Sequence, residues 1–375
     1  MSEIREKILE EFGENAFISK GKEDPNPLLM KNEAKRFVFV LIRETIGPFI
    51  VRSDVPEETI TINIQGRNVV EIPARKFKSR EKMAGIRFLR LLKVMPENYI
   101  YNEVNSREEL KNPTSILMGD TIVKGSDAGK SMIPSRLIYS HSYSIRDKYQ
   151  ITEVLQHNQL GDNGTTIDSE GNNKTGLFLT EYVKPGVFFP SFLVLQNPTP
   201  ELFFHTIVSL QASSYGAQTA ITGSNIKNHI VGILSCKNEP PVTSYTISRD
   251  FKLEGRSKIN RDELTTFIIK EILKNKTHED DTFFLLNSEV TSGILENFNG
   301  VGGIKNTSLN VNSLISKSSI DQVRQIYAEL TQEIEEFLSK IFPQTKPRKG
   351  NQQGEIQKDN VNEDQEENEN GESEN

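Results

Sequence analysis

Short runs of β-branched and aromatic residues recur along the sequence between Gly, Pro, Asn and Asp residues, and this pattern predicts β-strands. Residues 36–45, RFVFVLIRET, have the nearly continuous apolar character of a buried strand. Further strands are predicted at residues 48–52, 59–64, 116–123, 136–144, 181–196, 226–235 and 282–286. Pro185 and Pro190 lack an N–H group, so they confine the segment at 181–196 to a sheet edge or a bulge.

Apolar residues at helical spacing separate these strands. Helices are predicted at residues 4–18, 73–95, 199–212, 260–276 and 320–342. Thr199 before Pro200 is a favourable helix start, and Asn260 followed by Glu263 matches a capping box. In the last helix, apolar residues near heptad spacing cover only a short stretch, which favours packing on the core over a coiled coil with a partner.

The helix predicted at 73–95 has one apolar and one cationic face. Between Arg75 and Lys93 there are eight basic residues and one acid, Glu81. At about 100° per residue, one side carries Arg80, Lys82, Arg87, Arg90 and Lys93, with Met83 and Ile86 between them. The other side carries Ala84, Gly85, Phe88, Leu89, Leu91 and Leu92. Such a helix packs its apolar face on a core and presents its charge to an anion.

Ser79 is the predicted N-cap of this helix, because its hydroxyl can accept a hydrogen bond from the unpaired N–H groups of the first turn. Glu81 would then lie where the helix dipole favours a carboxylate. The basic run from Arg75 to Lys78 would lead into the helix N-terminus, which itself attracts phosphate. Three interpretations of the cationic face stay open here: a solvated surface, a site for a polyanion, and a peripheral membrane helix.

Charge is distributed unevenly along the chain. Residues 351–375 hold nine acids and one lysine, a net charge of −8 against −7 for the whole chain, so the rest carries +1. The segment 343–375 is therefore predicted to be a disordered, acidic tail. Residues 1–35 are predicted to form a lead-in helix and loop, and residues 36–342 one core in which the polar stretch at 99–180 is an insertion.

Composition disfavours several classes of protein. The single cysteine, Cys236, excludes an internal disulfide and a multi-cysteine zinc site. The five histidines are scattered without ligand spacing, so no metal and no other cofactor is expected. No apolar run reaches the ~18 residues of a bilayer span, and the N-terminus lacks the apolar region of a signal peptide. The protein is predicted to be cytoplasmic.

No catalytic constellation stands out. The run from Gly125 to Ser131 resembles a phosphate-binding loop, but it has three residues between its glycines where four are needed. Asp54, Asp120 and Asp127 could act as metal ligands or general bases, although loop aspartates are usually turn formers. The sequence therefore predicts a protein that is not an enzyme.

Basic residues beside aromatic ones give a stronger signal. They occur at Arg36–Phe37, Lys76–Phe77–Lys78 and Arg87–Phe88, and Tyr215 lies in a loop of small and hydroxyl residues at 213–223. Cations that bind phosphates, next to rings that stack on unpaired bases, are the usual design for single-stranded nucleic acid. The same rings can instead belong to the core. The loop can bring its N–H groups against a phosphate or ribose, or simply form a tight turn.

Four blocks of the sequence resemble the backbone subunit of type I-D CRISPR effector (Cascade) complexes, in the RAMP superfamily. They are residues 75–93, 112–130, 183–198 (VKPGVFFPSFLVLQNP) and, most specific, 215–232 (YGAQTAITGSNIKNHIVG). The resemblance implies an α+β fold with an RRM-like (ferredoxin-like) core sheet and large insertions, including a thumb-like hairpin that we assign to residues 145–180. It also implies an RNA-binding subunit that assembles in a helical row along CRISPR RNA, with target nucleic acid and other type I-D Cascade subunits as partners.

In that family the basic segment and the first helix of the core run against the guide, and a glycine-rich loop lies near the RNA. Carried over to this sequence, the resemblance places RNA contacts at Arg75, Lys76, Lys78, Arg80, Lys82, Arg87, Arg90, Tyr215, Gly216, Gln218, Thr219 and Thr222. The long acidic tail and the Asn/Gly-rich spacer within the insertion depart from the family pattern.

Two other functions stay open. The first is metal-dependent cutting of the target strand, as in backbone subunits of related type III complexes, with Asp54 as the candidate aspartate. The second is a protein scaffold whose basic helix meets an acidic partner. Magnesium-dependent cutting that requires Asp54 would indicate the first function. A protein that purifies without nucleic acid and does not retain RNA would indicate the second.

Overall fold

The computed structural model describes most of the chain up to Phe342. The described residues are 2–18, 26–29, 34–51, 55, 58–125, 128–129, 131–158, 165, 167, 171, 177–216, 224–253, 259–311, 314–315 and 317–342. The predictions for the tail at 343–375, for Asp54 and Asp127, and for most of residues 159–176 lie outside them.

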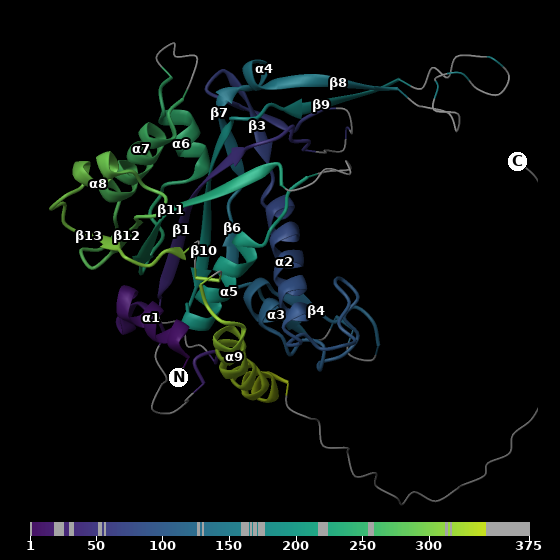
Figure 1. Ribbon diagram of the computed structural model, residues 1–375, viewed down its shortest axis with the longest axis vertical. Helices are drawn as coiled ribbons and strands as arrows, with labels where there is room; N and C mark the ends of the chain where they lie inside the picture. The colour runs from purple at the N-terminus through teal and green to yellow at the C-terminus, as the bar shows by residue number, and fades with distance from the viewer. Residues whose placement is uncertain are drawn as a thin grey trace, which may run out of the picture. The chain divides into compact units, whose positions relative to one another are not determined.

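A six-stranded sheet organises the fold (Figure 1). Its strands, in spatial order, are β13 (Ile304–Thr307), β12 (Thr282–Leu286), β11 (Ile226–Cys236), β1 (Arg36–Thr45), β10 (Phe188–Gln196) and β6 (Leu137–Tyr139). Neighbouring strands are antiparallel apart from β12 and β13, which are parallel. β1 is paired on both sides and has seven consecutive buried residues, as its apolar sequence predicts.

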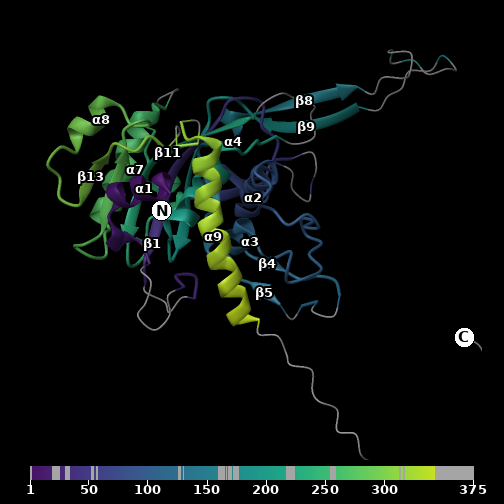
Figure 2. The same ribbon diagram turned by 60° about the horizontal axis from the view of Figure 1, so that its bottom comes forward.

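Side chains that alternate along β1 divide the core into two layers. Phe37, Phe39 and Leu41 pack in one layer, and Val38, Val40 and Ile42 pack in the other. The first layer is covered by α1 (Glu3–Phe12), α2 (Ala74–Leu91), α3 (Pro113–Met118), α5 (Pro200–Gln211) and α9 (Ile320–Ile341). The second is covered by α6 (Ser244–Asp250), α7 (Arg261–Lys274) and α8 (Ser292–Asn297). Figure 2 shows α9 and α2 on the side of the molecule away from α8.

Two helices of the first layer, α2 and α5, pack directly against each other. Gly85 allows their close approach, because a Cβ atom there would lie 2.8 Å from Ser209 Oγ and 3.2 Å from the ring of His205. Along the chain, β1 is followed by α2, β6, β10, α5 and β11, and these four strands are neighbours in the order β11-β1-β10-β6. The described residues therefore form an α+β fold whose main sheet is mostly antiparallel.

A two-stranded hairpin extends from one end of the sheet (Figure 1). Its strands are β8 (Thr152–Asn158) and β9 (Leu177–Val183). At its root, Val183 exchanges backbone hydrogen bonds with Phe49, at 2.8 and 2.9 Å. Nearby, β2 (Thr61–Ile64), β3 (Arg67–Ile72) and β7 (Ser142–Asp147) form a three-stranded sheet. Both strands overlap the segment 145–180 assigned to the thumb, an assignment that stays a prediction.

Several predicted elements have the predicted bounds. β1 and β12 match residue for residue, β11 and α9 differ by one residue at one end, and α5 differs by one residue at each end. Thr199 caps α5 by accepting a hydrogen bond from Leu202. Asn260 caps α7, but it accepts from Asp262 N and not from Glu263 N, so the predicted capping box is not formed. In the part of the chain that is described, no helix is long and apolar enough to cross a bilayer.

Other predictions are wrong. Residues 116–123 are not a strand, because α3 occupies the first of them, capped by Asn112, and only the two-residue β4 (Asp120–Thr121) follows. In the segment 48–52, the described residues 48–51 do not form the predicted strand and make only an isolated bridge at Phe49. The first helix ends at Phe12, where Gly13 adopts a φ of 82°. The segment 181–196 is divided between β9 and β10. β10 is an internal strand of the sheet, whereas the two prolines had predicted an edge or a bulge. β6 pairs only with Leu193 to Leu195, so Pro190 needs no N–H group for pairing with β6.

Candidate nucleic-acid interface

Helix α2 carries a row of solvent-facing cations that we call the basic stripe. Its members are Arg75, Lys76, Lys78, Arg80, Arg87 and Arg90. Five of them are exposed and Lys78 is half-buried. Lys76 and Arg80 lie one helical turn apart, so their side chains are neighbours on the helix surface. The seventh predicted cation of the helix, Lys82, is buried.

The start of α2 differs from the prediction. The helix begins at Ala74 with Pro73 as N-cap, so Ser79 lies inside the helix and does not cap it. Pro73 has extended backbone, with ψ of 140°, and makes no side-chain capping hydrogen bond. The run from Arg75 to Lys78 consequently forms the first helical turns and does not precede them.

The division of α2 into faces was also only partly predicted. Ile86 is fully buried although the periodicity places it among the cations, and Leu91, assigned to the apolar face, is 76% exposed. Leu91 is the last residue of the helix, where none of the described elements covers it. Helix α3 packs against α2 and covers part of the side that periodicity alone leaves to solvent.

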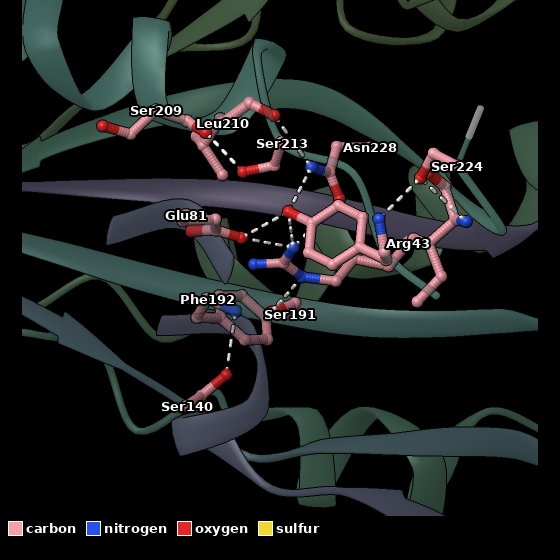
Figure 3. Close-up of polar contacts among 12 residues, drawn as sticks. Arg43, Glu81, Ser140, Ser191, Phe192, Ser209, Leu210, Ser213, Ser224 and Asn228 are labelled. Atoms are coloured by element: carbon pink, nitrogen blue, oxygen red, sulfur yellow. Dashed lines mark hydrogen bonds and ion pairs between the residues drawn. The ribbon is translucent and has the colours of Figure 1, made fainter. Parts of the chain in front are cut away.

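A buried ion pair attaches α2 to the central strand (Figure 3). Arg43 of β1 and Glu81 of α2 are both fully buried, and Arg43 Nη1 lies 2.7 Å from Glu81 Oε1. Tyr215 Oη donates to the same carboxylate oxygen at 2.6 Å. Burial disfavours the Arg43 cation, but the Glu81 carboxylate, together with Tyr215 and Tyr139, outweighs this effect and raises the pKa of Arg43. Glu81 therefore serves a buried pair, whereas the sequence had suggested that it interacts with the helix dipole.

The same network fixes the aromatic residues predicted to meet RNA. Phe77 is buried with its ring centroid 3.8 Å from the Arg43 guanidinium carbon, and Tyr215 is buried at the edge of Phe77. Burial, together with Glu81, raises the pKa of Tyr215. Phe37 is buried and Phe88 half-buried. The core interpretation is thus correct for most of these rings, and Tyr215 acts in this structure as a hydrogen-bond donor inside the protein.

A cleft of about 830 Å³ runs beside α2. Its walls include most cations of the first half of the helix, opposite Tyr101 and the segment Met118–Thr121. Lys82 Nζ donates to Gly119 O at 2.8 Å and lies 3.3 Å from Asp120 Oδ2. Tyr101, half-buried, lies 5.3 Å from the same ammonium group and is the one ring of this cleft that sequence reasoning missed. It has no basic neighbour in the sequence that could have indicated it.

The electrostatics of the cleft favour an anion. Burial lowers the pKa of Lys82, although Asp120 opposes the effect. Burial and the adjacent Lys82 cation also lower the pKa of Lys78. Both ammonium groups are therefore incompletely compensated by the protein, and a phosphate in the cleft would stabilise their charged forms.

Asp120 is occupied by structural contacts. Its Oδ2 accepts hydrogen bonds from Tyr99 Oη at 2.7 Å and Ser115 Oγ at 2.9 Å, besides the Lys82 ammonium. The other two candidate aspartates, Asp54 and Asp127, lie outside the described residues. Among the residues with described positions, no three His, Cys, Asp or Glu side chains come together in a way that could hold a metal ion.

The glycine-rich loop is only partly described. Gly216 is half-buried, and its carbonyl accepts a hydrogen bond from Arg80 Nη2 at 3.0 Å, which joins the loop to the basic stripe. Gln218, Thr219 and Thr222 lie outside the described residues. The structure thus brings two loop residues of the predicted RNA contacts, Tyr215 and Gly216, next to the cations of α2.

The chain resembles known proteins in its sequence family and in its fold. Comparison with curated proteins finds no match. The crystal structure of Thermofilum pendens Csc2 has 14% sequence identity and a TM-score of 0.52, over 90% of this chain and 98% of that one. Two chains from structures described as a CRISPR RNA-guided surveillance complex, one of them pre-nicking, each have 10% identity and a TM-score of 0.46, over 78% of this chain and 99% of theirs.

At these identities the structural likeness to the Thermofilum protein concerns the fold alone. The family model for Csc2 Crispr matches residues 70–290, a range that begins just before α2 and ends after β12. Since this range is more than half of the sequence, the chain belongs to the Csc2 CRISPR family.

Proposed function

We propose that this chain is a non-catalytic, RNA-binding backbone subunit of a type I-D CRISPR RNA-guided complex. The observation that carries the proposal is the basic stripe of α2 beside the cleft. Membership of a CRISPR family supports CRISPR RNA as the polyanion. Other Cascade subunits and target nucleic acid are the further partners, and the cell interior is the proposed location.

The geometry suits a phosphate backbone. From Arg75 to Arg90 the helix extends about 22 Å at ~1.5 Å per residue, so the stripe can follow several successive phosphates. Lys and Arg bind phosphate without reading sequence, which suits a subunit that must accept any guide. The buried Arg43–Glu81 pair fixes α2 on the sheet, so the stripe is presented by a rigid element.

The order of elements supports an RRM-like core. A ferredoxin-like arrangement places two helices on one face of an antiparallel sheet whose outer strands come second and last along the chain. Here β6 and β11 flank β10 and β1, and α2 and α5 share one face. Unlike a bare RRM, the second face is covered by α6, α7 and α8, so α2 and not the open sheet is the proposed RNA surface.

Copies of the chain are proposed to stack head to tail along one RNA, because a heterologous contact that does not close gives an open row. RNA that co-purifies with the protein should then be protected in fragments of regular length. The RNA contact itself is tested by replacing two exposed arginines of the stripe, Arg87 and Arg90, by glutamate and measuring RNA affinity across salt concentrations.

A further inference from the structure

A small apolar pocket borders the basic stripe. Its volume is about 170 Å³. Its apolar lining comes from five side chains that are buried in the protein: Phe49, Val51, Ile72, Phe77 and Tyr215. Lys76 and Arg80 line both this pocket and the larger cleft. The two cations therefore form a ridge that borders both the cleft and the pocket.

The walls of the pocket are held in place by contacts within the protein. Phe49 is hydrogen-bonded to Val183 at the root of the β8–β9 hairpin. Tyr215 N donates to Ser224 Oγ at 3.1 Å, and Tyr215 O accepts from Asn225 N at 2.7 Å. Phe77 is fixed beneath Arg43. A pocket whose walls are already ordered binds a ligand without the cost of ordering them.

The chemistry of the pocket selects a ligand with a flat apolar part beside a negative charge. Among the described residues that line it, none is acidic, and its two charged members are the cations of the ridge. A nucleotide of a single strand has this combination, because its base offers an apolar face and its phosphate lies one sugar away. An uncharged aliphatic ligand would make no charge interaction with Lys76 or Arg80.

We propose that this pocket takes one unstacked nucleobase of the bound single strand while Lys76 and Arg80 contact the adjoining phosphates. The inference rests on the proposed function, since it requires the strand to follow the basic stripe. It adds a contact to the base, which the stripe alone does not provide. The pocket presents few hydrogen-bonding groups, so it holds a base without distinguishing sequence.

The test compares two polymers of the same length and charge: single-stranded oligoadenylate, and the same ribose-phosphate backbone with hydrogen in place of every base. The native chain should bind oligoadenylate about tenfold more tightly, as expected for one base buried against aromatic rings. Ile50 is half-buried and lines the pocket. Substitution Ile50→Trp fills the pocket and should abolish this preference while affinity for the abasic polymer stays unchanged.

Ile320→Trp is the matched control, because Ile320 is 63% exposed at the start of α9, away from the described pocket residues. It should keep the full preference. If Ile50→Trp lowers the melting temperature, the smaller Ile50→Phe takes its place. Binding of both polymers without preference overturns the pocket assignment and leaves the proposed function intact. A preference that persists in the filled variant also overturns it, as expected if the pocket serves a protein side chain. Failure to bind either polymer contradicts the proposed function itself.

Discussion

Arg43 and Glu81 form an ion pair of 2.7 Å in which neither side chain is exposed. The pair joins the central strand β1 to the helix that carries the basic stripe, and Tyr215 at the start of the glycine-rich loop shares its carboxylate. Three separate parts of the chain thus meet at one charged point in the core. An isolated buried charge is costly, so each partner depends on the others.

Substitution Glu81→Gln should destabilise the protein by about 3–5 kcal/mol, because it leaves the Arg43 cation buried without a counter-charge. Chemical denaturation measures the free energy of unfolding. Glu3→Gln is the matched control, since Glu3 pairs with Lys7 at 2.6 Å on the surface and solvent screens that pair. Equal effects of the two substitutions would contradict the importance of the buried pair.

Substitution Tyr215→Phe separates a structural role from an RNA contact. It removes the hydroxyl that donates to Glu81 and accepts from Asn228 but keeps the ring. Glu81 keeps its bond to Arg43 and Asn228 its bond to Leu210, so the variant loses only the bonds to the hydroxyl, one of them to a charged group, which should cost about 1–3 kcal/mol of stability. RNA affinity, measured well below the melting temperature, should not change. A large loss of affinity in a stable variant would show that the hydroxyl reaches the RNA.

Gly85→Ala tests the close packing of α2 on α5. Alanine favours a helix by up to about 1 kcal/mol over glycine, but its Cβ would lie 2.8 Å from Ser209 Oγ. We expect a net loss of about 1–3 kcal/mol from overpacking. Ser209→Ala should recover much of it in the double variant, because the Ser209 hydroxyl is buried and has no hydrogen-bond partner among the described residues. Simple additivity of the two substitutions would count against this explanation.

His205 makes stability depend on pH. Burial lowers its pKa from 6.5 to about 3. Below about pH 6.5 His205 takes up a proton in the unfolded chain but not in the folded protein, so this residue lowers the free energy of unfolding by up to about 1.4 kcal/mol per pH unit until the folded pKa is reached. His205→Gln keeps groups that can bond to Thr114 and Tyr327 but does not titrate. The stability of this variant should fall less steeply than that of the native chain between about pH 6 and 4. Equal slopes of stability against pH for the two proteins would contradict the low pKa of His205.

The sequence predicted correctly those elements whose pattern depends only on residues close together in the chain. The unbroken apolar run of β1 and the Thr199–Pro200 start of α5 are examples. The predictions failed where a distant partner decides the outcome. Glu81 looked like a helix-start carboxylate because nothing in the sequence links it to Arg43, and Ile86 looked solvent-facing because periodicity does not show where α3 lies. The basic stripe could be predicted, whereas the burial of Lys82 and the contribution of Tyr101 depend on how residues 99–121 fold over α2.

The central claim is that the basic stripe binds the phosphates of single-stranded RNA. The most direct test measures the affinity of Arg87→Glu/Arg90→Glu for RNA at several salt concentrations. Lys270→Glu/Lys274→Glu is the control, since it makes the same change of charge at two exposed lysines of α7, in the other layer of the core. The stripe variant should bind more weakly, and its salt slope should fall by about 0.7 for each phosphate that the variant no longer binds, while the control keeps the native slope. An unchanged slope in a folded stripe variant would contradict the claim.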